Sequence, residues 1–251
     1  MLSYHKNTHN SELLAHVYAS IFNYPITSKE AKLWRIKLKN TSEKKLNFAT
    51  QIVEDLQKIP FILAIFVTGS VAAGNALQKA DVDLMIVTRP HTLWLTRVIV
   101  VLFLKLKKLY KHTVCPNIFL DTNHLEIKLK NLYTAHEVLQ AKCVFDRGNI
   151  YDRWVTENVW AKEYLPGAYS MVIVSMGKKS PRKNVLPPSS NTDLLFPLNL
   201  LVFFIQYLYM KRKMSNERVG LGYAFFHPNN LSRKVMETFD KKLRVLGIME
   251  K

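Results

Sequence analysis

Two apolar runs of strand length, joined by small residues, constrain the fold of this chain most strongly. Residues 61–68 (Phe-Ile-Leu-Ala-Ile-Phe-Val-Thr) form the first run, which ends at Gly69-Ser70. Small residues dominate 71–77 and predict a short helical turn, and a second apolar run follows at 84–87. Short apolar runs bounded by glycine and acidic residues are typical of buried strands. The pattern therefore predicts two strands joined by a small helix and a loop.

An acidic pair stands at the head of the second run. Asp81 and Asp83 are separated by one residue. Because side chains alternate faces along a strand, both carboxylates are expected on the same side of the sheet. Mg²⁺ takes oxygen ligands and is usually bound between a few carboxylates and substrate phosphates. The pair therefore predicts a site for a divalent cation.

The Gly69-Ser70 corner is suited to the phosphate end of such a site. Glycine lets a phosphate approach the backbone, the serine hydroxyl can donate to it, and N–H groups at a helix start attract anions. Glycine, serine and aspartate are also common in ordinary turns, so each half of the pattern alone is a weak signal. Their combination in one strand–turn–strand unit favours an active site.

Together, the Gly-Ser pair, the ten-residue spacer and the Asp-x-Asp that opens an apolar strand resemble the signature of the DNA polymerase β-like nucleotidyltransferase superfamily. Four shorter phrases resemble a bacterial group of nucleotidyltransferase-domain proteins. These phrases are Ile21-Phe22-Asn23-Tyr24-Pro25-Ile26-Thr27, Cys115-Pro116-Asn117, Asn158-Val159-Trp160 and Phe225-Phe226-His227-Pro228. The resemblance implies an α/β (α+β) fold in which a small mixed sheet is flanked by amino-terminal and carboxy-terminal helices.

The resemblance also implies an activity. A nucleoside monophosphate would pass from a nucleoside triphosphate to an acceptor hydroxyl or phosphate, with pyrophosphate leaving. Asp81 and Asp83 would bind Mg²⁺, while Gly69 and Ser70 would hold the β and γ phosphates. Displacement at phosphorus depends on charge neutralisation and in-line positioning, which metals held by paired carboxylates provide.

Members of the superfamily normally have a third carboxylate on a later strand, and here the pattern departs. The matching strand is 114–120, and the matching position carries Asn117. If residues 121–124 form a hairpin turn, Glu126 folds back onto the same face as Asn117. Asp121 lies on that face too. The expected catalytic set is Asp81, Asp83 and Glu126, with Asp121 as the other candidate; without either, the chain would bind nucleotide but catalyse slowly.

The charge balance is strongly basic, with 36 Lys and Arg residues against 19 Asp and Glu residues and a formal net charge of +17. Such a surface attracts polyanions, so RNA or another polyanionic acceptor is a candidate partner. The lysines could equally serve solubility. The basic clusters lack the interleaved aromatic residues of a single-strand stacking platform, which argues against sequence readout.

Cysteine content and the apolar segments bear on location. Cys115 and Cys143 have no paired spacing and no zinc-ligand companions, so reduced thiols in a cytoplasmic protein are expected. The polar opening of the chain does not resemble a signal peptide. The longer of two strongly apolar segments, Leu194 to Met210, has seventeen residues but includes Asn199 and Gln206. It predicts a buried helix, and no membrane insertion is expected.

The chain divides by pattern into four parts. They are an amino-terminal helical region that resembles a truncated winged helix (1–60), a nucleotidyltransferase core (61–165), a flexible loop (166–193) and a carboxy-terminal helical region (194–251). Within the first part, Ser11 is a candidate helix cap, Thr27 and Glu30 have capping-box spacing, and a helix is expected over 44–58.

Three other functions are compatible with the sequence. A catalytically weakened homologue would keep nucleotide binding only. A basic nucleic-acid-binding regulatory module would depend on the charge and the amino-terminal helices rather than on the core. A small-molecule enzyme would adenylylate an aminoglycoside-like hydroxyl, although the basic composition argues against the acidic acceptor site that this requires. The oligomeric state is not predicted.

Overall fold

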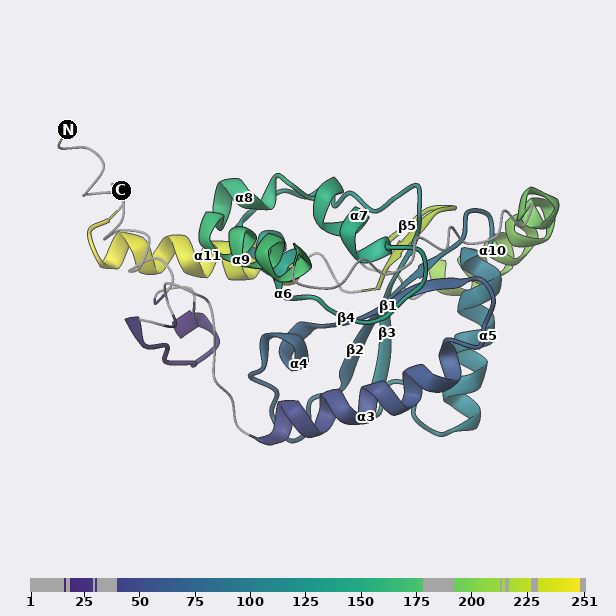
Figure 1. Ribbon diagram of the computed structural model, residues 1–251, viewed down its shortest axis with the longest axis horizontal. Coiled ribbons are helices and arrows are strands. Elements are labelled where there is room, and N and C mark those ends of the chain that lie inside the picture. The colour runs from purple at the N-terminus through teal and green to yellow at the C-terminus, as the bar shows by residue number, and fades with distance from the viewer. Residues whose placement is uncertain are drawn as a thin grey trace.

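A six-stranded sheet lies between two layers of helices (Figure 1). The computed structural model describes residues 16, 19–28, 30, 40–177, 192–212, 214, 217–226 and 230–248. The strands are β1 (Ile62–Thr68), β2 (Val82–Thr88), β3 (Val114–Asp121), β4 (Lys142–Asp146), β5 (Arg218–Val219) and β6 (Tyr223–Phe225). The helices are α3 (Asn40–Leu56), α4 (Gly69–Ala73), α5 (Leu93–Leu106), α6 (Leu132–Gln140), α7 (Ile150–Glu157), α8 (Ala161–Tyr164), α9 (Pro166–Gly177), a 3₁₀ turn η1 (Thr192–Leu195), α10 (Phe196–Lys211) and α11 (Asn230–Val245).

The strand order is β4-β1-β2-β3-β6-β5, and the sheet is mixed. Strands β2 and β3 are parallel, with α5 as the crossover between them, whereas every other neighbouring pair is antiparallel. The expected fold class, a small mixed sheet flanked by helices, is confirmed.

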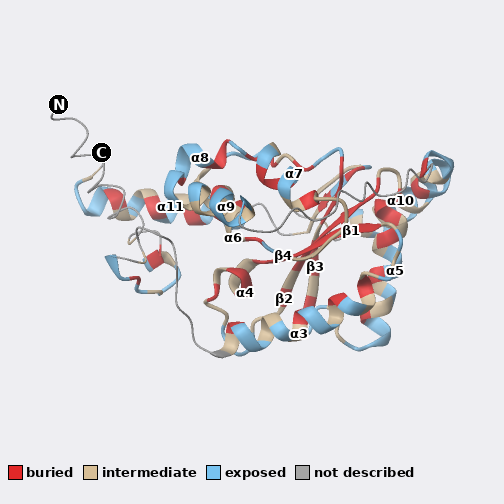
Figure 2. Cartoon of the chain, in the orientation of Figure 1, coloured by how far each residue is buried: buried red, intermediate tan, exposed pale blue. Residues whose placement is uncertain are grey.

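Alternation along β2 separates the two cores of the molecule. Leu84 and Ile86 pack in the core that contains residues of α3, α4 and α5. Met85 and Val87 pack in the opposite core, which contains residues of α6, α7 and α8. Figures 1 and 2 show these two helical layers on either side of the buried strands. Because side chains alternate faces, Asp83 belongs to the α6 side of the sheet.

The predicted hairpin after β3 is wrong. Strand β3 pairs with β6, with Leu120 opposite Tyr223 and Phe119 opposite Ala224. Residues 122–131 form turns and loop rather than a returning strand. The edge of β3 is therefore filled by a segment about a hundred residues away in sequence, which a local turn signal cannot reveal.

Strand β4 has no strong signal in the sequence. It is a five-residue edge strand whose residues are partly or wholly exposed, so it lacks the apolar run that marked β1. The division into four parts stays a prediction. The structure shows that the carboxy-terminal region contributes β5 and β6 to the same sheet as the core strands.

Two local predictions for the amino-terminal region, a capping box and a helix, agree with the structure. The Glu30 N–H donates to Thr27 Oγ1 at 3.2 Å and the Thr27 N–H donates to Glu30 Oε2 at 2.9 Å, so the predicted capping box is confirmed. The helix expected over 44–58 is present as α3. The candidate cap at Ser11 and residues 178–191 of the predicted flexible loop lie outside the described residues. Residues 166–177, also predicted as loop, instead form α9.

The prediction that the apolar segment from Leu194 is a buried helix is wrong. Among the described residues, Thr192–Lys211 is long and apolar enough to cross a membrane by length and composition, and 6% of its apolar window is buried inside the molecule. The segment contacts the rest of the protein through one side of α10, which packs on α5, and leaves the other side exposed (Figure 2).

Candidate active site

Gly69 and Asp83 lie in direct contact at the end of the β1–β2 pair. The antiparallel register places Thr68 opposite Asp83, so Gly69 is the next residue beyond the pair. Gly69 has a φ of +61°, and a Cβ added there would lie 2.3 Å from Asp83 Oδ2. A side chain at this position would therefore be strained by the backbone and would collide with the carboxylate. The Gly-Ser corner and the acidic pair meet as expected.

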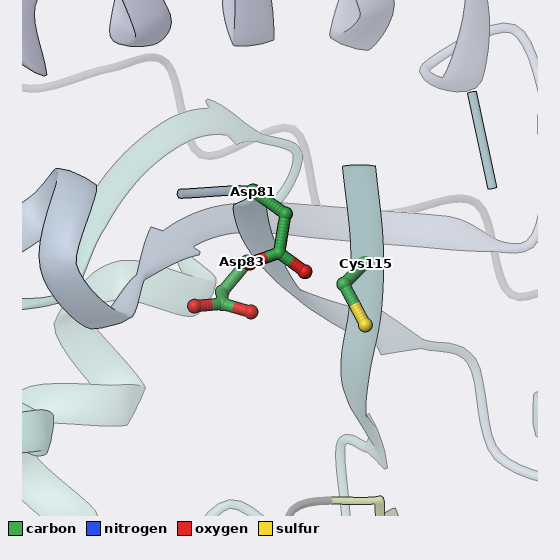
Figure 3. Close-up of side chains that lie close together, drawn as sticks. All are labelled: Asp81, Asp83 and Cys115. Atoms are coloured by element: carbon green, nitrogen blue, oxygen red, sulfur yellow. The ribbon is translucent and has the colours of Figure 1, made fainter. Parts of the chain in front are cut away.

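Asp81, Asp83 and Cys115 form a cluster in which one potential ligand atom from each lies within 4.8 Å of the others (Figure 3). Cys115 enters the cluster because β3 places it opposite Asp83. Burial, followed by the charges of Asp83 and Asp81, raises the pKa of the Cys115 thiol to about 12. A neutral thiol is a poor ligand for a hard cation, so the cluster offers two carboxylates. This donor set fits Mg²⁺ completed by phosphate oxygens.

The environment of Asp83 favours its protonated form until a cation is present. Burial, then the charges of Asp81 and Glu137, raises the pKa of Asp83 to about 7, and the hydrogen bond from Asn117 opposes this shift. Such a carboxyl is costly to ionise alone and gains from a divalent cation beside it.

Asn117 occupies the position expected for the third acid. It lies where the β2–β3 register shifts between Leu84 and Met85, so β3 contains one extra residue there. Its amide donates to Asp83 Oδ1, while its own Oδ1 accepts from the Cys115 thiol at 2.6 Å. An amide cannot accept a proton as a base at ordinary pH, so Asn117 can orient Asp83 but cannot replace a third carboxylate.

Neither sequence-predicted third carboxylate lies in this cluster. Asp121 is opposite Thr88, five positions along β2 from Asp83, which corresponds to about 17 Å of strand. The Asp121 carboxylate instead contacts His124 Nδ1 at 2.6 Å. The Glu126 carboxylate is bound by Lys128 and by Lys130, the latter at 2.9 Å. The hairpin that would have carried Glu126 to the site does not form.

Glu137 on α6 is the acidic residue that the sequence analysis missed. It lines the same cavity as Gly69, Ser70 and Asp83, and burial raises its pKa to about 7. The available signal was its place four residues after Tyr133, on the same helix face. A carboxylate on a packing face is costly unless a ligand, a metal or a proton compensates it.

Helix α3 fixes the loop between the corner and the acidic pair. The Ala76 N–H donates to Ser42 Oγ at 3.0 Å, and Lys45 Nζ donates to the Ala80 carbonyl at 2.5 Å. Since Ala80 immediately precedes Asp81, these two bonds hold the loop in the position from which the acidic pair enters β2.

The cavity at this site has a volume of about 390 Å³, which lies in the range of small-molecule and cofactor sites. Its wall includes Phe22 and Tyr24 from the amino-terminal segment, which lies far from the Gly-Ser corner in sequence. Asn75 also lines it, and Asn75 Oδ1 is a buried acceptor without a hydrogen-bond partner among the described residues. A second, mostly apolar cavity of about 90 Å³ adjoins the first and shares Tyr133 and Glu137 with it.

Part of the chain that includes this site is similar to a known protein family. Residues 49–137 match the family model described as a nucleotidyltransferase domain. The match includes the Gly-Ser corner and both aspartates, and Glu137 is its last residue. Residues 49–137 are thus similar to a nucleotidyltransferase domain, in agreement with the DNA polymerase β-like superfamily that the sequence signature resembles.

Two solved structures show a limited likeness to the chain. One is a toxin–antitoxin crystallised with AMP-PNP, with 14% sequence identity and a TM-score of 0.32. The other is a mutant of the toxin–antitoxin MntA-HpeT, with 13% identity and a TM-score of 0.32. Each covers 51% of this chain and 98% of its own length. The comparison with curated proteins found no match.

Proposed function

We propose that this protein is a cytoplasmic, Mg²⁺-dependent nucleotidyltransferase that transfers a nucleoside monophosphate from a triphosphate such as ATP to an acceptor hydroxyl or phosphate. The observation that carries the proposal is the contact between Gly69 and Asp83, with Asp81 in the same cluster and a nucleotide-sized cavity beside them. This arrangement can hold the metal and the phosphates of one ligand together.

In this proposal, Asp81 and Asp83 hold the metal, while Gly69 and Ser70 hold the β and γ phosphates. When bound, Mg²⁺ neutralises phosphate charge and favours displacement at the α-phosphorus. The acceptor oxygen forms a bond to the α-phosphorus as the bond to the β-phosphate oxygen breaks, and pyrophosphate carries away that electron pair. The chain itself contributes alignment, because the contact between Gly69 and Asp83 fixes the phosphate and metal positions relative to each other.

The base and sugar would lie against the amino-terminal segment. The rings of Phe22 and Tyr24 line the cavity and offer stacking surfaces. The Asn75 Oδ1 atom would accept from a base amino group or a ribose hydroxyl, and this would satisfy its unpaired lone pairs. The short phrase around Tyr24 thereby gains a role in nucleotide binding.

Glu137 is the proposed acceptor of the proton that the attacking hydroxyl loses. It lies where the large cavity meets the apolar one, so an acceptor entering from the apolar side would meet Glu137 before the α-phosphorus. Its raised pKa, about 7, is suited to taking a proton near neutral pH. The expected third carboxylate would then come from a helix on the far side of the cavity rather than from β3.

The direct test is label transfer. The purified chain is incubated with each α-labelled nucleoside triphosphate and Mg²⁺, with total RNA, protein and small hydroxyl compounds as separate acceptors. RNA is included because the net charge of +17 suits a polyanionic acceptor. We expect transfer to one acceptor class, lost with a chelator and in Asp81→Asn. The matched control Asp121→Asn, whose carboxylate lies at the far end of β2, should transfer label normally. Transfer by Asp81→Asn at the native rate would refute the assignment.

A further inference from the structure

Helix α10 packs on α5 through the side that carries its polar residues Asn199 and Gln206. Asn199 Oδ1 accepts from the backbone N–H of Trp94 at 2.9 Å and from the backbone N–H of Leu95 at 3.3 Å. Gln206 Nε2 donates to the Trp94 carbonyl at 3.1 Å, and Gln206 Oε1 accepts from Arg97. The polar residues of this apolar helix therefore face the protein, where they have partners.

The opposite side of α10 is an apolar surface without a covering element among the described residues. Its side chains are between 48% and 64% exposed. We call this set the outer stripe, and it consists of Leu198, Leu201, Phe204, Ile205 and Leu208. Helix α5, on which α10 packs, also exposes Val98, Ile99, Leu102 and Leu106. An exposed apolar surface of this extent marks an interaction site.

The order of residues along α10 indicates the chemistry of the partner. Beyond the outer stripe comes Tyr209, which is 71% exposed, and then the exposed Lys211 and Arg212. Tyrosine and basic side chains beside an apolar helix face suit the surface of an anionic bilayer, because aromatic rings lie at headgroup level and Lys and Arg side chains extend to the headgroups. The end of α5 repeats the pattern, since exposed Lys105, Lys107 and Lys108 surround Leu106.

We propose that this surface docks the protein on an anionic lipid bilayer, with α10 lying in the plane of the interface and its outer stripe among the acyl chains. An in-plane position keeps the contacts of Asn199 and Gln206 with α5, which a spanning position would break. The net charge of +17 favours an anionic surface and opposes pairing with a second copy of the same charge. This inference does not depend on the proposed activity.

The test uses the full chain and vesicles of phosphatidylcholine with or without phosphatidylglycerol. The stripe variant carries Leu201→Glu, Ile205→Glu and Leu208→Glu. The matched control carries Val159→Glu, Val174→Glu and Val245→Glu, three residues that are also more than half exposed, so both triples change the charge equally. In flotation, the native chain should bind the phosphatidylglycerol vesicles, the stripe variant should bind about tenfold or more weakly, and the control should stay within about twofold.

A second measurement does not depend on a loss of binding. Brominated acyl chains should quench the added fluorescence of Leu208→Trp but not that of Val245→Trp. Three results would overturn the proposal: no flotation of the native chain, an equal loss in both triple variants, or quenching that is the same at both positions. Sedimentation that shows a dimer abolished only by the stripe variant, with vesicle binding unchanged, would assign the surface to a second copy instead.

Discussion

A Cβ at Gly69 would lie 2.3 Å from the Oδ2 atom of Asp83, so the corner that is proposed to hold phosphate and the acid that is proposed to hold the metal occupy adjoining space. This contact follows from the antiparallel β1–β2 register, which places Thr68 opposite Asp83. The two halves of the sequence signature are therefore parts of one site.

Gly69→Ala should abolish label transfer and metal binding, because its Cβ would displace the Asp83 carboxylate. Gly247→Ala is the matched control, since Gly247 also has a positive φ, +68°, but no atom within 4 Å of the added Cβ. Each substitution should cost about 1 kcal/mol of backbone strain or slightly more, measured by thermal or urea unfolding. Only Gly69→Ala should lose activity; equal activity in both variants would contradict the contact.

Metal affinity should depend on pH through Asp83. Burial and Asp81 raise the pKa of the Asp83 carboxyl from 3.8 to about 7, so below neutrality a cation must displace a proton. Apparent Mg²⁺ affinity should therefore rise about tenfold per pH unit up to about pH 7 and then level off, as measured by calorimetric titration. Asp83→Asn should bind weakly at every pH, whereas Asp121→Asn should keep the native profile. An apparent Mg²⁺ affinity of the native chain that does not change with pH would contradict the raised pKa of Asp83.

The raised pKa of Asp83 also makes the stability of the folded protein depend on pH. Between about pH 4 and pH 7 the unfolded chain has lost the Asp83 proton that the folded protein retains, so the free energy of unfolding should fall as pH rises through this window. Mg²⁺ at saturating concentration should reduce this loss, because it binds the folded, ionised form. Urea unfolding across this range, with Asp83→Asn as the comparison, measures the effect; a native slope equal to that of the variant would exclude it.

Glu137→Gln should lower kcat by about 10²- to 10⁴-fold with little change in the KM for nucleotide, which is the usual size for loss of a general base. Glu126→Gln should change kcat by less than about twofold, because Glu126 pairs with Lys128 and Lys130 outside the cluster. Single-turnover label transfer distinguishes the two. A large loss of kcat in Glu126→Gln, with little change in Glu137→Gln, would instead support Glu126 as the third carboxylate.

Phe22→Ala and Tyr24→Ala should each raise the KM for nucleotide by about 5- to 150-fold, the equivalent of about 1–3 kcal/mol for one stacked base. Phe22 is 42% exposed and lines the cavity. Tyr164→Ala removes an aromatic ring that is similarly exposed, at 41%, on α8, and should leave KM unchanged. An unchanged KM in both cavity variants would place the base elsewhere.

The sequence alone could predict the strands β1 and β2, the helix α3 and the meeting of Gly69 with the acidic pair. These features depend on neighbours in the chain, such as an apolar run of strand length and the alternation that puts Asp81 and Asp83 on one face. The Asn117 substitution at the third position was equally visible. Its role beside Asp83 was not, because the register shift in β3 decides where its amide points.

Tertiary structure decided which distant segments complete the site and the surface. Strand β6 rather than a local hairpin pairs with β3, which leaves Glu126 with its lysines, while the packing of α6 brings Glu137 to the cavity. Likewise, the polar residues of α10 did not indicate a buried helix; their partners on α5 leave the apolar side uncovered. Local pattern fixes which face of an element is apolar, but the choice of partner depends on the free energy of packing the whole chain, which a local pattern does not contain.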